Sequence, residues 1–156
     1  MKSAQDWLSE YAESHQHPLN IKIHWVCVPL IMLSLISLLS MVPLNISYLN
    51  NYPQLNNCGF LLILLASVYY FILSKPLFIG MIPVSIILIF GVEFLDVFFI
   101  SKFYLSLIIF VIAWFGQFYG HKIEGKKPSF FKDIQFLLIG PLWLLSKIYR
   151  QYDISY

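Results

Sequence analysis

Three of the four histidines lie in one short stretch near the start of the chain. They are His15, His17 and His24, and the fourth, His121, lies far along the sequence. Both stretches lie at the mouth of a long apolar run. Neutral imidazole is the commonest side-chain metal ligand, and three or four imidazoles with few carboxylates suit iron, zinc or copper. The sequence therefore predicts that the two stretches meet and hold a metal ion at a membrane surface.

The spacing within the first stretch leaves two candidates for one ligand position. On a single unbroken helix, His15 and His24 would lie on opposite faces. Pro18 removes this objection, because proline breaks a helix interior but suits the first turn of a new helix. His15 can then fold back toward the helix that carries His24. His17 would share a face with His24 if that helix began earlier, so His15 and His17 both stay candidates.

Polar residues flank the histidines at helical spacing. Asn20 precedes His24 by one turn, and Gln117 precedes His121 by one turn, so each pair shares a helix face. We expect Asn20 and Gln117 to hydrogen-bond a ligand imidazole or a substrate oxygen. Glu124 follows His121 on the same face, and three roles are open to it: ligand, orienting partner of a histidine, or proton carrier.

The composition indicates an integral membrane protein. Of the 156 residues, 59% are hydrophobic and 12% are charged, with a mean hydropathy of +0.74. Soluble domains are about 45–50% apolar and about 25% charged, and a small soluble fold could not bury this much apolar surface. The length predicts a single membrane-embedded domain, residues 1–156. The net charge of +2 is too small to indicate a nucleic-acid partner, so the lipid bilayer is the expected partner.

The apolar runs predict an all-α fold with about four transmembrane helices. An amphipathic helix is expected before them, over residues 3–14. A last apolar run is too short for a span and is split at Gly140-Pro141, so we interpret it as a re-entrant or interfacial helix. The four expected spans cover residues 25–43, 60–73, 77–100 and 103–119, and the short run covers 134–145.

The basic residues predict the orientation. With four spans, both termini lie on one side, together with all of the ten Lys and Arg residues except Lys102. Because cytoplasmic loops carry the excess of Lys and Arg, both termini should be cytoplasmic, in a bacterial inner membrane or the endoplasmic reticulum. The same topology places all four histidines on one face of the membrane. The basic loop 122–133 is expected to contact lipid headgroups.

Two carboxylates in the third run offer an alternative function. Glu93 and Asp96 lie near its far end, and a charged residue inside a membrane is a functional candidate. Their expected place near the outer interface favours an ordinary surface role. The alternative is a non-enzymatic metal-binding scaffold, or a small transporter with these carboxylates on its pathway. The sequence contains no G-x-S-x-G, H-E-x-x-H or glycine-rich phosphate motif.

The order of these residues resembles a known family. It is similar to the small membrane proteins whose studied fungal member is the 2-hydroxy fatty acid dioxygenase of phytosphingosine breakdown. The resemblance covers about residues 11–150, and its most specific part is the segment Gly-His-x-x-Glu-x-x-x-Pro. The residues that carry it are His15, Pro18, Asn20, His24, Pro29, Trp114, Gln117, Phe118, Gly120, His121, Glu124, Pro128, Gly140 and Pro141.

The resemblance implies an activity and a ligand set. The family's activity is an iron(II)-dependent α-oxidation, in which a 2-hydroxy fatty acid and dioxygen give a fatty acid one carbon shorter. The implied Fe(2+) ligands are His15, His24 and His121. The fungal pattern places its glutamate one residue later after the histidine than Glu124, which is a departure of this chain from the family.

Overall fold

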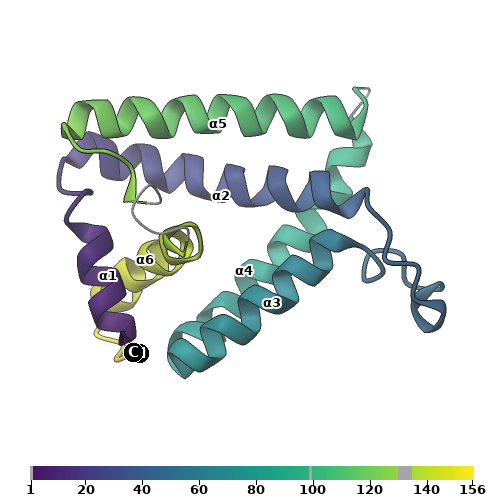
Figure 1. Cartoon of the computed structure of the whole chain (residues 1–156), viewed down its shortest axis with the longest axis horizontal. Helices are drawn as coiled ribbons and strands as arrows, with labels where there is room; N and C mark the ends of the chain where they lie inside the picture. Colours follow the sequence, from purple (N-terminus) through teal and green to yellow (C-terminus); the bar gives the residue numbers. More distant parts are fainter. Residues whose placement is uncertain (1, 99, 130–134) are drawn as a thin grey trace.

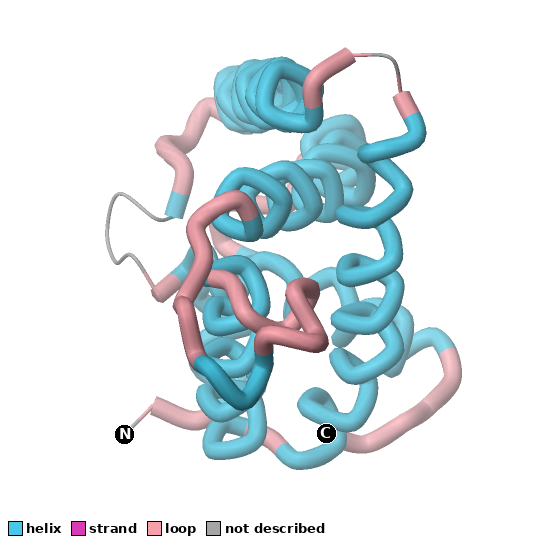
Figure 2. Tube along the Cα trace, turned by 90° about the vertical axis from the view of Figure 1, so that its right-hand side faces the viewer, coloured by secondary structure: helices cyan, strands magenta, loops and turns pink. Residues whose placement is uncertain are grey.

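The computed structural model describes residues 2–98, 100–129 and 135–156, and these residues form helices joined by loops (Figure 1). The prediction of an all-α fold is confirmed. Both ends of the chain lie at the same edge of the molecule, as Figure 2 also shows from the side. The helices are α1 (Ala4–Ala12), α2 (Pro18–Ser40), η1 (Ser47–Leu49), α3 (Cys58–Leu73), α4 (Lys75–Phe94), η2 (Leu95–Val97), α5 (Lys102–Glu124) and α6 (Phe136–Gln151).

Among the residues that the structure describes, three helical segments are long and apolar enough to cross a membrane. They are α2 (Pro18–Ser40), α4 together with η2 (Lys75–Val97), and α5 (Lys102–Glu124), each of 23 residues. A span needs about 20 residues, so α3, with 16 residues, is an apolar helix below that length. Large apolar side chains such as Phe115, which is 70% exposed, cover the outer faces. The chain is therefore a membrane protein, with three helices of spanning length where the sequence predicted about four.

The helix boundaries follow local rules at both ends. Pro18 opens α2 as predicted, and His17 caps the helix by accepting a hydrogen bond at Nδ1 from the backbone N–H of Leu19. The basic loop was expected to begin at Lys122, but α5 continues to Glu124. It stops at Gly125, whose φ of 71° lies in the left-handed region that glycine adopts without a steric penalty.

Helices α2 and α5 lie side by side over much of their length (Figure 1). On α5, Gly116 and Gly120 form a glycine pair of the kind that lets membrane helices approach closely. A Cβ at Gly116 would lie 2.6 Å from Sγ of Cys27, and one at Gly120 would collide with the side-chain oxygen of Asn20. Side chains of α2 therefore lie directly against the backbone of α5, beside His121, the residue that follows Gly120.

The last helix departs from the expected short, divided segment. It runs without a break through Gly140-Pro141, and most of its first half is buried. Proline in a helix costs a hydrogen bond and a steric clash, but packing of this half against α1 and α4 outweighs that cost. The predicted split at Gly140-Pro141 is therefore wrong. The expected first residue of the run, Ile134, and the end of the basic loop, residues 130–133, lie outside the described residues.

Helix α1 packs on α6 and closes the histidine end of the molecule. As predicted, α1 is amphipathic, with Trp7, Leu8 and Tyr11 buried. The rings of Trp7 and Phe136 meet edge to face with centroids 5.2 Å apart. Because α1 is anchored on α6, the loop after α1 is held beside the start of α2.

Candidate metal centre

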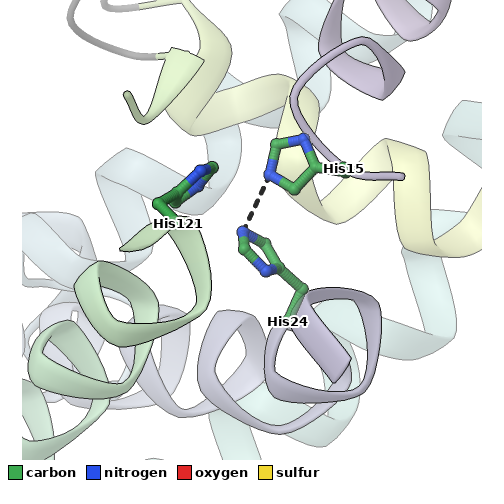
Figure 3. A group of neighbouring side chains, drawn as sticks. All are labelled: His15, His24 and His121. Carbon is green, nitrogen blue, oxygen red and sulfur yellow. Dashed lines mark hydrogen bonds between the residues drawn. The ribbon is translucent and has the colours of Figure 1, made fainter. Parts of the chain in front are cut away.

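Three histidines from three separate segments converge in the interior (Figure 3). His15 lies in the loop between α1 and α2, His24 in the second turn of α2, and His121 in the last turn of α5. Their side chains are only 2%, 1% and 5% exposed. One nitrogen from each ring can be chosen so that all three lie within 4.8 Å of one another, a grouping that could hold a metal ion.

The hydrogen bonds of His15 and His24 fix which ring nitrogen carries the proton. His15 Nδ1 lies 2.6 Å from the carbonyl oxygen of Tyr11, and His24 Nδ1 lies 2.9 Å from that of Asn20. A carbonyl oxygen only accepts, so each Nδ1 is the N–H donor and each Nε2 of the neutral ring carries a lone pair. Backbone carbonyls fix metal-binding histidines in this manner.

The two Nε2 atoms face each other at 2.9 Å. With both Nδ1 atoms donating to carbonyls, two neutral rings have no hydrogen to place between the Nε2 atoms. The contact is therefore two opposed lone pairs, which is unfavourable unless a cation binds both. This pair is the observation that most directly indicates a metal site.

The third imidazole completes a three-sided arrangement. The ring of His121 lies with its centroid 4.8 Å from that of His15 and 5.1 Å from that of His24, nearly perpendicular to both. Its Nδ1 is buried and has no hydrogen-bond partner among the described residues. Buried polar atoms are normally paired, so an unpaired imidazole nitrogen beside two opposed lone pairs fits a third ligand.

Burial and neighbouring rings set the protonation state of His15. Loss of hydration, reinforced by the nearby His24, lowers the pKa of His15 to about 3, so this imidazole is neutral at physiological pH. The ring of Tyr11 stacks on it with centroids 4.0 Å apart, and burial raises the pKa of the Tyr11 hydroxyl, which stays protonated. The ring of Trp143 is tilted against the same imidazole, with ring centroids 5.1 Å apart. His15 is thus held as a neutral donor in an aromatic cage.

The carboxylate of Glu124 binds the backbone at the start of α2. It accepts hydrogen bonds from the N–H groups of Gln16 at 2.9 Å and His17 at 2.8 Å, and from the side-chain amide of Asn20 at 3.1 Å. These donors lie at a helix N-terminus, where a negative charge is favourable. Glu124 is not part of the group of metal-ligand atoms found among the described residues. Its position makes it a clamp that holds the His15 loop against α5.

Of the two candidate ligands in the first stretch, the structure brings His15 into the group. His17 is exposed, and its Nδ1 is engaged in capping α2. Asn20 is fully buried between the two stretches, and it donates to the carbonyl of Ser14 at 3.2 Å. Its side chain thus joins the His15 loop to Glu124, while its backbone carbonyl orients His24.

A cavity of about 60 Å³ adjoins the histidines. His24 and His121 line one side, and Gln117, which is 6% exposed, also lies in its wall. The rest of the wall is largely apolar. Gln117 therefore lies where it can reach a ligand in the cavity, whereas Asn20 and Glu124 lie behind the histidines.

Sequence reasoning missed three features of the centre. The aromatic cage was not identified, although Tyr11 precedes His15 by one helical turn. The glycine pair Gly116 and Gly120 has a readable four-residue spacing. The loop after α5 is tied to the loop after α1 by Lys126, whose ammonium donates to the carbonyl of Glu13 at 2.6 Å, and no sequence signal indicates this contact.

The carboxylates of the alternative function lie at the other end of α5. Asp96 forms an ion pair with Lys102 at 2.8 Å, at the first residue of that helix, while His121 lies in its last turn. Glu93, on α4, is exposed and borders a small cavity that residues of α2 and α3 also line. Neither carboxylate contacts the histidine group.

One comparison with known proteins found a match over most of the chain. A family model described as "2-hydroxy-palmitic acid dioxygenase Mpo1-like" matches residues 1–152. No curated protein and no solved structure matches the chain. The family match includes every histidine and all three residues of the buried group. Because it extends over nearly the whole sequence, the chain belongs to the Mpo1-like family.

Proposed function

We propose that this protein is an iron(II)-dependent dioxygenase that converts a 2-hydroxy fatty acid and dioxygen into a fatty acid one carbon shorter. The family description supports the reaction class and the substrate. The observation that carries the proposal is the pair of opposed Nε2 lone pairs of His15 and His24, with His121 beside them. Three neutral imidazoles suit a divalent transition metal such as iron.

In this proposal His15, His24 and His121 hold the iron, and His17 does not. Bound iron supplies the redox chemistry that lets dioxygen react with the substrate. The protein contributes a fixed orientation of each ring: Tyr11 and Asn20 offer backbone carbonyls to Nδ1, and Glu124 keeps the His15 loop in place. His24 and His121 line the cavity, so a substrate in the cavity would lie beside the ion that these histidines would hold.

The overall reaction balances without an added reductant. The bond between carbons 1 and 2 of the 2-hydroxy acid breaks, carbon 2 becomes the new carboxyl carbon, and carbon 1 leaves as carbon dioxide. Dioxygen is reduced by electrons drawn from the substrate, giving one new carboxyl oxygen and one water. The 2-hydroxyl is essential to this balance, because carbon 2 must already carry one oxygen.

The surroundings of the centre suit a substrate with a polar head and an apolar tail. The Gln117 amide lies in the cavity wall, where it can hydrogen-bond the carboxylate or the 2-hydroxyl. The cavity continues along apolar side chains of α2, among them Val28 and Met32. With α3 counted as the fourth span, we propose that the centre lies at the cytoplasmic surface of a bacterial inner membrane or the endoplasmic reticulum, with both termini cytoplasmic, because Lys and Arg gather on that side.

The test is oxygen uptake by purified protein loaded anaerobically with iron(II). We expect uptake with 2-hydroxypalmitate and, by mass spectrometry, a product one carbon shorter. Palmitate, which lacks the 2-hydroxyl, should give neither. The zinc-loaded protein is the matched control for a scaffold or a hydrolytic site. If iron is bound and 2-hydroxypalmitate still causes no uptake, the proposed function is wrong.

A further inference from the structure

A second cavity lies between α2, α4 and α6, and its lining is entirely apolar and aromatic. Its volume is about 140 Å³, larger than that of the cavity beside the histidines. Trp25 and Pro29 line it on α2, while Met81, Val84 and Leu88 line it on α4. We call this space the tail cavity.

The tail cavity and the histidine cavity share a wall. Val28, Met32 and Pro141 border both spaces. Val28 lies one helical turn beyond His24 along α2, and Met32 one turn further. Methionine has a flexible unbranched side chain that adapts to its neighbours. The Met32 side chain therefore lies where a change of rotamer would alter the separation between the histidine cavity and the tail cavity.

Prolines in the helices explain why a space is present here. Pro29 and Pro141 both lie in the wall, inside α2 and α6 respectively. Each removes a backbone hydrogen bond and displaces the preceding turn, which kinks or bends a helix. Protein interiors are normally close-packed, and a proline in each of the two facing helices is a local departure from regular packing beside the unfilled space.

We propose that the tail cavity holds the distal part of the substrate's alkyl chain while the carboxyl end lies at the three histidines. The identity of the head group rests on the proposed function; the path of the tail rests on the shared wall. Lipid tails are as apolar as the cavity lining, so hydrophobicity gives little net affinity inside a bilayer. The cavity therefore acts through its shape, and it selects which chain lengths reach the metal in a productive position.

Crosslinking locates the tail independently of turnover. The probe is 2-hydroxypalmitate with a diazirine near its methyl end, photolysed anaerobically with the full-length iron-loaded protein in nanodiscs. We expect labels on Met81, Val84 and Leu88, competed by excess unlabelled 2-hydroxypalmitate. Ile82, Ile86 and Ile87 are the internal control, because they lie on the same helix but are 43%, 48% and 68% exposed toward lipid.

Filling the cavity tests its role in selection. In Val84→Phe, we expect turnover of 2-hydroxypalmitate to fall about tenfold relative to 2-hydroxyoctanoate, the scale on which overfilling an apolar site acts. Val111→Phe, on the lipid-facing side of α5, is the matched control and should leave the ratio unchanged. An equal fall for both chain lengths in Val84→Phe overturns the proposal.

The outcomes separate the two proposals. Competed labels on the cavity residues without oxygen uptake would overturn the proposed function and support the tail cavity. Oxygen uptake with labels only on the lipid-facing isoleucines would overturn the tail cavity and leave the function standing. Cavity labels that excess 2-hydroxypalmitate does not compete would mean that bilayer lipid fills the space, which also overturns the tail cavity.

Discussion

The carboxylate of Glu124 accepts a hydrogen bond at 2.8 Å from the backbone N–H of His17, a residue 107 positions earlier in the chain. This bond fixes the start of α2 against the end of α5. It also sets the position of the loop that carries His15, because the neighbouring N–H of Gln16 binds the same carboxylate. A residue outside the metal-ligand group thus determines whether two separate segments present their imidazoles to one point.

Replacing Glu124 with glutamine should weaken metal binding about 10–100-fold, the range found for groups that orient metal ligands. Glutamine keeps one acceptor oxygen, but its amide nitrogen opposes an N–H donor. Titration of the purified protein with iron(II) or zinc measures the effect. Glu13→Gln is the matched control, because that carboxylate is exposed in the same loop region. Equal affinity of the two variants would contradict the clamp.

Alanine substitutions of the three buried histidines and of the exposed His17 should have opposite effects on metal retention. We expect alanine at His15, His24 or His121 to abolish metal retention after gel filtration, because two imidazoles alone leave the ion weakly held. His17→Ala should retain the metal, since His17 only caps α2. The metal content of the four purified variants, measured by mass spectrometry, tests this prediction. Full retention in any one of the first three variants would remove that residue from the ligand set.

Metal removal should loosen the loop that carries His15. Without a cation, the opposed lone pairs of His15 and His24 repel each other, and a ligand bound only by the folded state stabilises it. We expect a lower melting temperature after chelation and faster proteolysis in the loop 13–17, both reversed by iron(II) or zinc. His24→Ala should show no response to added metal. A metal-free protein as resistant as the loaded one would argue against this coupling.

Glycine at position 120 should be required for the approach of α2 to α5. A Cβ there collides with the Asn20 side chain, so Gly120→Ala should destabilise the fold by about 1–3 kcal/mol, as overpacking does. In an Asn20→Ala background the same substitution should cost less, because the obstructing amide is gone. Unfolding titrations of the two single variants and the double variant form the cycle that tests this. If the losses of unfolding free energy in the two single variants simply add in the double variant, the contact between position 120 and Asn20 does not limit how closely α2 approaches α5.

Glu93 should be dispensable for turnover. It is exposed, and it lies on α4 away from the histidine group. We expect Glu93→Gln to consume oxygen with 2-hydroxypalmitate at the wild-type rate. A large loss of activity in Glu93→Gln would instead favour a pathway through the carboxylates of the third apolar run.

The sequence predicted the parts of this structure that depend on local rules. Apolar runs separated by polar loops gave the helices, and Pro18 gave the start of α2. The resemblance to the dioxygenase family is confirmed by the family match. The spacing could not decide between His15 and His17, because the choice depends on which of the two side chains hydrogen-bonds the backbone at the start of α2. Once His17 caps α2, its ring points outward and His15 remains for the interior.

Other features depend on packing between distant segments. The helix continues through Gly140-Pro141 because α1 and α4 cover it, a contact that no local pattern records. The basic loop was expected from Lys122, yet α5 continues to Glu124, because His121 and Glu124 face partners on the neighbouring segments. Glu124 binds the backbone N–H groups of Gln16 and His17. Every residue type except proline has such a donor, so no sequence pattern can indicate this contact.

The histidine group joins two segments about a hundred residues apart in the sequence, and this separation has a consequence for biosynthesis. Ribosomes extend a chain at about 5–20 residues per second. His15 and His24 therefore emerge roughly 5–20 s before His121, and α6, which anchors α1, emerges later still. During that interval the two opposed imidazoles lack their third partner, and α1 has no surface to pack on. We expect metal loading to be a late event that follows insertion of the whole chain, so that a bound ion marks a completed protein.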